Sequence, residues 1–351
     1  MAGPAGDGGA RRRRVRSRVL LAAVVLVVVV GAVVATFLLM SPRATPPAGS
    51  PSPTPTASAS ETVSSSPSAT LPPLASGAMN ILVLGSDIRG NARDAVARQE
   101  AGGGVVDQRS DMIMLIHVPA DRSRVFGISI MRDTWVTIAG HGQAKVNAAL
   151  ALGGPRLAAD TVAAMLSTRI DHYAMLDFDG FKAITDALGG VDVNVPLAFT
   201  ATFDTHHAFA QGLNHLDGQA ALEFVRERYA FADGDYQRVR DQQAFVRSLV
   251  AQLLTTGRVR GPAEAMGAVA LASPYVITDP GLDATGIAAL GYGLRGIDPA
   301  ADVFFTLPTA GTGTSADGQS IVVPDDAGIA EVAAALARDD LGGYAAAHGL
   351  G

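Results

Sequence analysis

The feature that most constrains this chain is an uninterrupted apolar run, residues 19–40, which holds 22 residues and no charge. About 20 apolar residues are enough to cross a bilayer as a helix, so the run predicts one transmembrane span. Six arginines stand directly before it: Arg11, Arg12, Arg13, Arg14, Arg16 and Arg18. Positive charge is retained in the cytoplasm. We therefore expect a single-pass protein of the cell membrane, with a cytoplasmic basic tail (residues 1–18) and an extracytoplasmic remainder.

A cleaved signal peptide is the alternative interpretation of the same run. The apolar region of a signal peptide spans about 7–15 residues and ends at a small-residue cleavage site. This run is longer and ends in Leu38-Leu39-Met40, which favours an uncleaved anchor. A single span also argues against a transporter or a channel.

Charge is divided unevenly along the chain. The formal net charge of -6 combines +5 on residues 1–40 with -11 on the remainder, which has 21 basic and 32 acidic residues. An acidic exported part disfavours nucleic acid as a partner. The chain has no cysteine, which excludes a disulfide scaffold, a thiolate zinc site, an iron–sulfur cluster and a cysteine nucleophile.

The remaining chain divides into a linker and one folded domain. Residues 41–77 are rich in Pro, Ser, Thr and Ala and cannot bury a core, so they predict an extended linker. Short apolar runs then alternate with amphipathic stretches. We expect strands at 79–84, 112–118, 191–195 and 303–307, helices at 155–167, 178–188, 236–254 and 326–337, and an Asp217 helix cap. This alternation, without an internal repeat, predicts a three-layer α/β domain over residues 78–341, followed by a tail at 342–351.

Arginines and carboxylates stand where predicted strands end and on two helices that follow residue 217. The candidates are Arg89, Arg109, Arg132, Arg226, Arg228 and Arg238, with Gln242 one turn after Arg238. A guanidinium group pairs with phosphate oxygens and stays charged, so several arginines in an acidic domain favour a compact polyanion such as a pyrophosphate. Asp87 and Asp111 offer the hard oxygen ligands that Mg²⁺ takes together with substrate phosphates.

Each of these residues also has an ordinary structural interpretation. An isolated Arg132–Asp133 pair is usually a structural ion pair. Asp87 can end a strand in an Asx turn. Arg226 and Arg228 can close a helix at its carboxyl end, where cations are favoured.

A series of short sequence segments, in fixed order along the folded domain, resembles the pattern of a known protein family. The segments are Asn80–Arg89, Arg109–Met114, Ser129–Thr134, Lys145–Ala149, Gly153-Gly154, Ile170–Tyr173, Gly180-Phe181, Gly189–Val193, Leu216–Leu222, Val225–Arg228 and Asp235–Gln243. Together they resemble the LytR-CpsA-Psr (LCP) family of bacterial cell-wall glycopolymer ligases. Three features depart from the family pattern. Met131 stands where the family often has Pro, Asp241 stands where it usually has Arg, and residues 90–108 form a longer connection between Asp87 and Asp111.

The resemblance implies an α-β-α fold with a central mixed sheet, and a phosphotransferase. Such an enzyme moves a glycopolymer from a polyprenyl-pyrophosphate carrier to a muramic acid hydroxyl of peptidoglycan, through a phosphodiester. Arg132, Arg228 and Asp111 are then the expected catalytic residues, and Asp87 and Asp111 would hold Mg²⁺ or Mn²⁺. The six arginines and Gln242 would bind the phosphates, and either Asp111 or Asp133 would accept the hydroxyl proton.

Other functions use similar residues. A pyrophosphatase would act on the same carrier with water as the acceptor, and a non-catalytic module would only bind the lipid-linked polymer. A transcriptional attenuator is disfavoured because 18 residues before the span cannot hold a folded DNA-binding domain. The polymer could be teichoic acid, capsular polysaccharide, arabinogalactan or another secondary wall polymer. Arginine supplies 25 of the 27 basic residues, which is typical of a high-GC genome and favours an actinobacterial polymer.

Overall fold

The computed structural model describes residues 71–88, 92–102, 105–106, 108–255 and 261–350. The predicted cytoplasmic tail, the predicted span at 19–40 and the linker up to residue 70 lie outside these ranges. Within them, no helix has both the length and the apolarity to cross a bilayer. The end of the predicted linker packs against the domain, because Leu71 and Leu74 contact its core.

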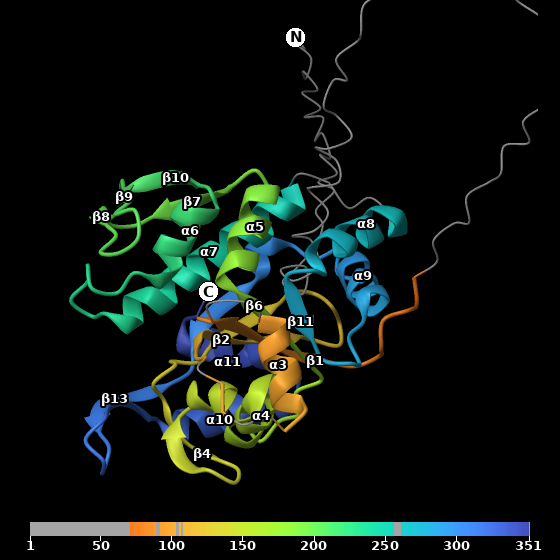
Figure 1. Ribbon diagram of the computed structural model, residues 1–351. Coiled ribbons are helices and arrows are strands. Elements are labelled where there is room, and N and C mark those ends of the chain that lie inside the picture. The colour runs from red at the N-terminus through yellow and green to blue at the C-terminus, as the bar shows by residue number, and fades with distance from the viewer. Residues whose placement is uncertain (1–70, 89–91, 103–104, 107, 256–260, 351) are drawn as a thin grey trace, which may run out of the picture.

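A six-stranded sheet forms the centre of the domain (Figure 1). Its strands, in spatial order, are β11 (Val276–Thr278), β6 (His172–Asp177), β1 (Met79–Ser86), β2 (Ser110–Val118), β3 (Phe126–Ser129) and β12 (Val303–Thr306). β1 pairs antiparallel with β2 and parallel with β6, while β3 pairs antiparallel with β2 and parallel with β12. The sheet is therefore mixed, which confirms the expected topology.

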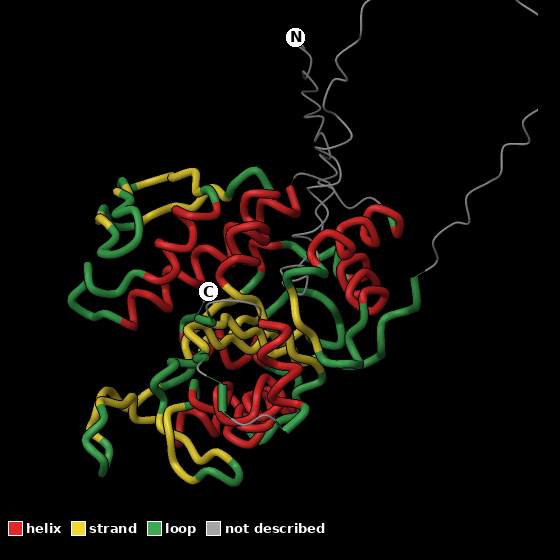
Figure 2. The backbone as a smooth tube through the Cα atoms, in the orientation of Figure 1, coloured by secondary structure: helices red, strands yellow, loops and turns green. Residues whose placement is uncertain are grey.

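Side chains along β1 alternate between two cores. Ile81 and Val83 belong to one hydrophobic cluster, and Leu82 and Leu84 belong to another. Because successive side chains of a strand point to opposite faces, a strand that is apolar at every position needs cover on both sides. Figure 2 shows that cover as helices on both sides of the central strands.

Two sets of helices provide the outer layers. One face carries α5 (Phe178–Ala187), α6 (Gly218–Arg226), α7 (Asp235–Thr255), α8 (Pro262–Ala272) and α9 (Ala284–Gly293). The other carries α3 (Ala92–Glu100), α4 (Ala148–Met165), α10 (Asp326–Ala337) and α11 (Leu341–His348). The three-layer prediction is confirmed. The Asp217 side chain caps α6 by accepting from the Ala220 backbone N–H, as predicted.

Four two-stranded sheets and one short helix complete the described part of the chain. The sheets pair β4 (Trp135–Ile138) with β5 (Gly142–Lys145), β7 (Val191–Val195) with β10 (Gly212–Leu216), β8 (Phe199–Thr200) with β9 (Ala208–Phe209), and β13 (Thr309–Thr314) with β14 (Ser320–Pro324). A 3₁₀ helix, η2, spans Pro299–Ala301. The pattern of the sequence did not predict β13 and β14. β13 is a run of small residues with a weak burial pattern, and β14 is a short apolar segment in which Ile321 and Val322 are buried.

Helix α4 begins earlier than predicted. The prediction placed its start at Pro155, but the helix begins at Ala148 and bends at Gly153-Gly154. Gly154 has φ 74°, a left-handed conformation that a residue with a Cβ adopts only at a cost. The proline therefore begins the second segment of a kinked helix, where its missing N–H is harmless.

The packed domain continues beyond residue 341. Leu341 and Ala345 of α11 are 1% and 3% exposed and belong to the second core, together with Val332 of α10. The carboxyl end of the chain therefore contributes to stability as a structural helix.

We predict that Leu341→Ala lowers the free energy of unfolding by about 2–5 kcal/mol, because truncation of a buried leucine loses apolar burial and leaves a cavity. Leu213→Ala is the matched control, because Leu213 is 74% exposed. Its effect should stay within about 0.5 kcal/mol. Urea unfolding followed by circular dichroism measures both. Equal effects of the two substitutions would contradict the placement of α11 in the core.

Candidate functional site at the end of the central strands

Two carboxylates, Asp87 and Asp111, lie close together where β1 ends and β2 begins. Asp87 directly follows β1, and its Oδ1 accepts a hydrogen bond from the Arg109 backbone N–H at 2.5 Å. The Asp87 N–H in turn donates to the Arg109 carbonyl at 3.0 Å. Burial raises the pKa of Asp87, and the nearby negative charge of Asp111 raises it further. The two predicted metal ligands are therefore close enough to repel each other.

Asp111 is joined to Arg132, which lies just beyond β3. The Arg132 Nη1 donates to Asp111 Oδ1 at 2.5 Å, and both side chains are mostly buried. Burial acts to lower the pKa of Arg132, but the carboxylates of Asp111, Asp235 and Asp133 together raise it. The guanidinium therefore stays charged. Arg132 Nε is 3.7 Å from Asp133 Oδ2, so the ion pair with the adjacent Asp133 is weaker than the ion pair with Asp111.

A second carboxylate, Asp235 at the start of α7, lies among three arginines. Its oxygens are 3.1 Å from Arg238 Nη2, 3.4 Å from Arg228 Nη1 and 3.5 Å from Arg132 Nε. Burial acts to raise the pKa of Asp235, but Arg238, Arg132 and Arg228 lower it overall. We call Arg132, Arg228 and Arg238 the arginine cluster. It carries three positive charges around one carboxylate.

Arg238 is the most buried member of the arginine cluster, at 3% exposure. Burial lowers its pKa, and the like charge of Arg132 lowers it further. The Nε atoms of Arg238 and Arg132 are buried, and no described residue accepts a hydrogen bond from them. Buried donors without partners are costly, so the cluster is suited to an additional anionic ligand.

Glu227 sets the directions of the two arginines beside it. It is fully buried, and its carboxylate accepts from the backbone N–H groups of Thr202, Arg228, Tyr229 and Ala230 at 2.6–3.0 Å. Burial acts to raise the pKa of Glu227, but these hydrogen bonds lower it overall. The carboxylate thus fixes the backbone turn that ends α6. Arg226 and Arg228 consequently line two different cavities.

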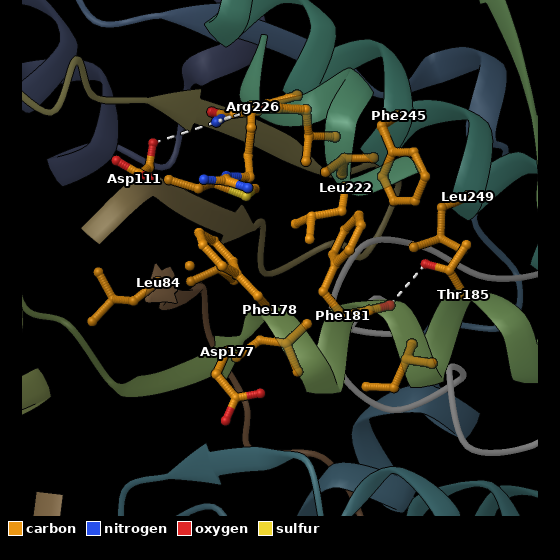
Figure 3. A pocket seen from close by; sticks show the side chains of 18 residues that line it. Leu84, Asp111, Asp177, Phe178, Phe181, Thr185, Leu222, Arg226, Phe245 and Leu249 are labelled. Carbon is orange, nitrogen blue, oxygen red and sulfur yellow. Dashed lines mark hydrogen bonds between the residues drawn. The ribbon is translucent and has the colours of Figure 1, made fainter. Parts of the chain in front are cut away.

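The first cavity, which we call the apolar pocket, lies between the sheet and α5, α6 and α7. It holds about 90 Å³, and Phe178, Phe181 and Leu249 point into it (Figure 3). Arg226 and Asp111 lie together at one end of the pocket, away from Leu249 (Figure 3). The remaining lining residues are Val83, Leu84, Gly85, Met112, Leu176, Asp177, Ile184, Thr185, Leu222, Val225, Gln242, Phe245 and Val246.

Arg226 lies between the faces of two aromatic rings at the mouth of this pocket. Its guanidinium carbon is 4.4 Å from the ring centre of Phe178 and 4.8 Å from that of Phe203. Its Nη1 is 3.2 Å from Asp204 Oδ2. Cation–π contacts hold a guanidinium in a fixed plane while leaving its edge free for hydrogen bonds.

The second cavity, which we call the polar cleft, is open and holds about 880 Å³. Its charged floor consists of Arg109, Arg132, Arg228, Lys145, Asp133, Asp233 and Asp235. Lys145 Nζ is 3.3 Å from Asp133 Oδ1. The Asp111–Arg132 pair joins the two cavities, because Asp111 lines the apolar pocket and Arg132 lines the polar cleft.

The predicted residues are therefore brought together to different degrees. Arg132, Arg228 and Arg238 share Asp235, while Arg109 and Arg226 lie at the cleft and the pocket respectively. Gln242 lines the pocket, but its Nε2 donates to the carbonyls of Asp111 and Val225. It holds β2, α6 and α7 together, and its predicted role in orienting phosphate stays a prediction. Arg89 lies outside the described residues.

The sequence pattern did not identify three residues that lie at the site: Asp235, Lys145 and Glu227. Asp235 stands one helical turn before Arg238, a spacing that places both on one face and could have revealed the contact. Lys145 stands beside a strand end, as the other candidates do. Glu227 offered no signal, because a carboxylate between two arginines is ordinary on a helix surface and its burial depends on the loop that folds over it.

Asp87 and Asp111 fit a divalent cation by their chemistry. Two carboxylates with like charge at close range gain from a cation between them, and Mg²⁺ usually takes one or two carboxylates plus phosphate oxygens and water. In the part of the chain that the structure describes, no group of three or more His, Asp and Glu is placed to hold a metal ion. Substrate oxygens would have to complete the coordination.

Comparison with known proteins identifies the domain. The profile of the LytR_cpsA_psr family matches residues 51–338. The cell wall biosynthesis protein LcpA of Corynebacterium glutamicum is 29% identical over 283 residues, which cover 72% of this chain and 54% of LcpA. The polyisoprenyl-teichoic acid--peptidoglycan teichoic acid transferase TagU of Bacillus cereus is 38% identical over 173 residues, which cover 49% of this chain and 51% of TagU. This chain thus spans about half the length of these curated relatives.

The solved structures agree on the fold. The crystal structure of TagV from B. subtilis superposes with a TM-score of 0.64 and 25% sequence identity, and the match covers 76% of this chain and 98% of TagV. The central mixed sheet and the helices on both faces are therefore the architecture of a known group of proteins.

The buried carboxyl group of Asp241, on α7 next to Gln242, is expected to make the stability of the fold depend on pH. It is 2% exposed, and burial raises its pKa to about 7. Its Oδ1 accepts from Gln237 Nε2 at 2.8 Å, while no described residue donates to Oδ2. The folded state therefore holds this proton more tightly than the unfolded state between pH 3.8 and about 7, so stability falls as pH rises through that window.

We predict that Asp241→Asn is more stable than the wild type above pH 7, by about 1–4 kcal/mol, because it removes the cost of a buried carboxylate. The advantage should shrink toward pH 4. Asp160→Asn, at a side chain that is 56% exposed, is the control and should show no such trend. Urea unfolding at pH 5, 6, 7 and 8 measures both. A stability difference that does not change with pH would refute the burial of a titrating group at this position.

Proposed function

Because this chain belongs to the LytR_cpsA_psr family, we propose that it is a transferase of cell-wall assembly. It moves a glycopolymer from a polyprenyl-pyrophosphate carrier to peptidoglycan and forms a phosphodiester. The observation that carries the proposal is the arginine cluster at the junction of an apolar pocket and an open polar cleft. An isoprenoid chain, a pyrophosphate and a saccharide follow one another in the carrier, in the same order as these three surfaces. The names of LcpA and TagU support the same process.

The arginine cluster would hold the pyrophosphate. Arg132 and Arg228 line the polar cleft, and their side chains are 18% and 31% exposed, so an incoming anion can reach both guanidinium groups. Phosphoryl transfer through a loose transition state requires positioning and charge neutralisation more than a protein nucleophile. Arg132 and Arg228 would therefore act by stabilising charge that develops on the phosphate oxygens.

The apolar pocket would receive the part of the isoprenoid chain nearest the pyrophosphate. Arg226 at its mouth contacts the ring faces of Phe178 and Phe203, so it can bind a phosphate while the rings contact the lipid. The pocket holds only about 90 Å³, so a long chain would have to separate α5 from α6 and α7.

The reaction assigns different roles to the two candidate bases. The acceptor hydroxyl oxygen would form a bond to the saccharide-bearing phosphorus, the bond from that phosphorus to the bridging oxygen would break, and polyprenyl phosphate would leave. Asp133 lines the polar cleft, whereas Asp111 faces the apolar pocket and accepts from Arg132. We therefore assign the hydroxyl proton to Asp133. Asp87 and Asp111 would hold Mg²⁺ or Mn²⁺, which would neutralise charge on the phosphates.

The location follows from the sequence and is part of the proposal. The apolar run at 19–40 would anchor the chain in the cell membrane, with the arginine-rich tail in the cytoplasm. The transferase domain would then lie outside, where peptidoglycan and the saccharide end of the carrier are found.

We predict that Arg132→Ala or Arg228→Ala lowers kcat/KM for transfer by about 30- to 1000-fold, because each loses about 2–4 kcal/mol of charge stabilisation in the transition state. The assay combines the full chain, Mg²⁺, a polyprenyl-pyrophosphate saccharide and peptidoglycan oligomers, and mass spectrometry detects the phosphodiester conjugate. Arg156→Ala is the control, because its side chain is 78% exposed.

The same assay separates the competing functions. Release of lipid phosphate without a conjugate would identify a pyrophosphatase. Tight binding of the carrier without turnover, with any acceptor, would identify a binding module. Full activity in Arg132→Ala and Arg228→Ala would refute the site.

We predict that affinity for polyprenyl pyrophosphates rises at least about tenfold for each of the first isoprene units added, since a buried CH₂ group contributes about 0.8 kcal/mol. Binding of inorganic pyrophosphate should be weak. Calorimetric titration with geranyl, farnesyl and geranylgeranyl pyrophosphate measures the trend. An affinity independent of chain length would remove the apolar pocket from the binding site.

A further inference from the structure

One part of the lining of the polar cleft, which we call the wall, is uncharged. The β13–β14 hairpin contributes Thr312, Gln319, Ser320, Ile321 and Val322 to the lining, and all five are uncharged. The amide Nε2 of Gln319 donates to Asp317 at 2.6 Å, which orients its carbonyl oxygen as the free end of the amide. This wall offers neutral donors and acceptors, which suit hydroxyl and acetamido groups better than phosphate.

The hairpin is held at a fixed position relative to the arginine that carries the chemistry. The Val322 N–H donates to the Asp133 carbonyl at 2.9 Å, within a parallel bridge between Thr134 and Val322. On the other side, the Tyr236 hydroxyl lies 3.1 Å from Thr309 Oγ1 and so connects β13 to α7. β14 accordingly packs against β4, the strand that follows Arg132 and Asp133. The wall and Asp133 therefore form one rigid unit.

The direction of attack places the acceptor on this side. In phosphoryl transfer the attacking and leaving oxygens lie roughly in line with phosphorus. If the leaving lipid phosphate is on the side of the apolar pocket, beyond Asp111, the attacking oxygen has to enter from the polar cleft. The cleft, about 880 Å³ in volume, has room for several sugar residues.

We propose that the β13–β14 hairpin binds the acceptor saccharide, with Thr312 and Gln319 selecting which hydroxyl group reaches Asp133. The inference rests on the proposed transferase function. Thr312 and Gln319 are specificity residues: they contact the acceptor at a distance from the phosphorus and take no part in the bond changes.

The test uses the full chain with the double substitution Thr312→Val and Gln319→Leu, which keeps side-chain size and removes hydrogen-bonding groups. The acceptor is a soluble glycan oligomer of N-acetylglucosamine and N-acetylmuramic acid. We expect the KM for this acceptor to rise about tenfold, the loss expected for two neutral hydrogen bonds, while kcat/KM for acceptor-independent hydrolysis of the carrier falls by less. Thr314→Val is the matched control, because it makes the same change on the same strand outside the cleft.

The outcomes separate this inference from the proposed function. An unchanged KM, or an equal loss of transfer and hydrolysis, would overturn the role of the hairpin while leaving the transferase intact. Absence of any conjugate with the wild type would instead refute the transferase. Direct titration of the glycan oligomer then still decides the inference, which requires about tenfold weaker binding by the double variant and wild-type binding by Thr314→Val.

Discussion

The site depends on one electrostatic arrangement, a single carboxylate among three guanidinium groups. Asp235 lies within 3.5 Å of Arg132, Arg228 and Arg238, which come from three different parts of the chain. Without Asp235 the three like charges would repel one another across a mostly buried volume. Asp111 and Asp133 also pair with Arg132, and together these carboxylates keep the three guanidinium groups charged and close together. The protein thus holds a preorganised anion site whose field does not have to be assembled when the ligand arrives.

The surrounding structure places that charge cluster between an apolar pocket and a polar cleft. The end of the sheet brings Asp87, Asp111 and Arg132 to one edge, and α6 and α7 bring the remaining arginines over it. Because Glu227 fixes the backbone between Arg226 and Arg228, these neighbours diverge, one toward an apolar pocket and the other toward a polar cleft. A ligand that is part lipid and part saccharide could therefore bind with its lipid in the apolar pocket and its saccharide in the polar cleft.

Much of this could be predicted from the sequence, for identifiable physical reasons. Runs that are apolar at every position, such as 79–84, indicate strands covered on both faces, and the cap at Asp217 is a local signal. Arg132 and Asp111 were recognisable because they stand at strand ends. The start of α4 was predicted wrongly because Pro155 suggests a helix start whether or not another turn precedes it.

Other features depend on contacts between distant segments. β13 has no hydrophobic pattern of its own, and its hairpin with β14 is held in place by the bridge between Thr134 and Val322. The burial of Glu227 depends on the loop that carries Thr202. The nearest carboxylate to Arg132 is that of Asp111, which is 21 residues away, while the adjacent Asp133 forms the weaker ion pair. Pairing across a sheet is set by register, which a single sequence specifies only through the whole fold.

The lining of the apolar pocket has a thermodynamic consequence. Ile184, Phe245, Val246 and Leu249 line it and also belong to the main hydrophobic core on that face of the sheet. A lipid chain that enters the pocket would contact these core side chains directly. It would then become part of the packing that stabilises the fold. Ligand occupancy and folding stability are then linked quantities: saturation with carrier at 100 times its Kd would add about 2.7 kcal/mol to the free energy of unfolding. The ligand-free protein would be the less stable form, and this lower stability would allow the pocket to open.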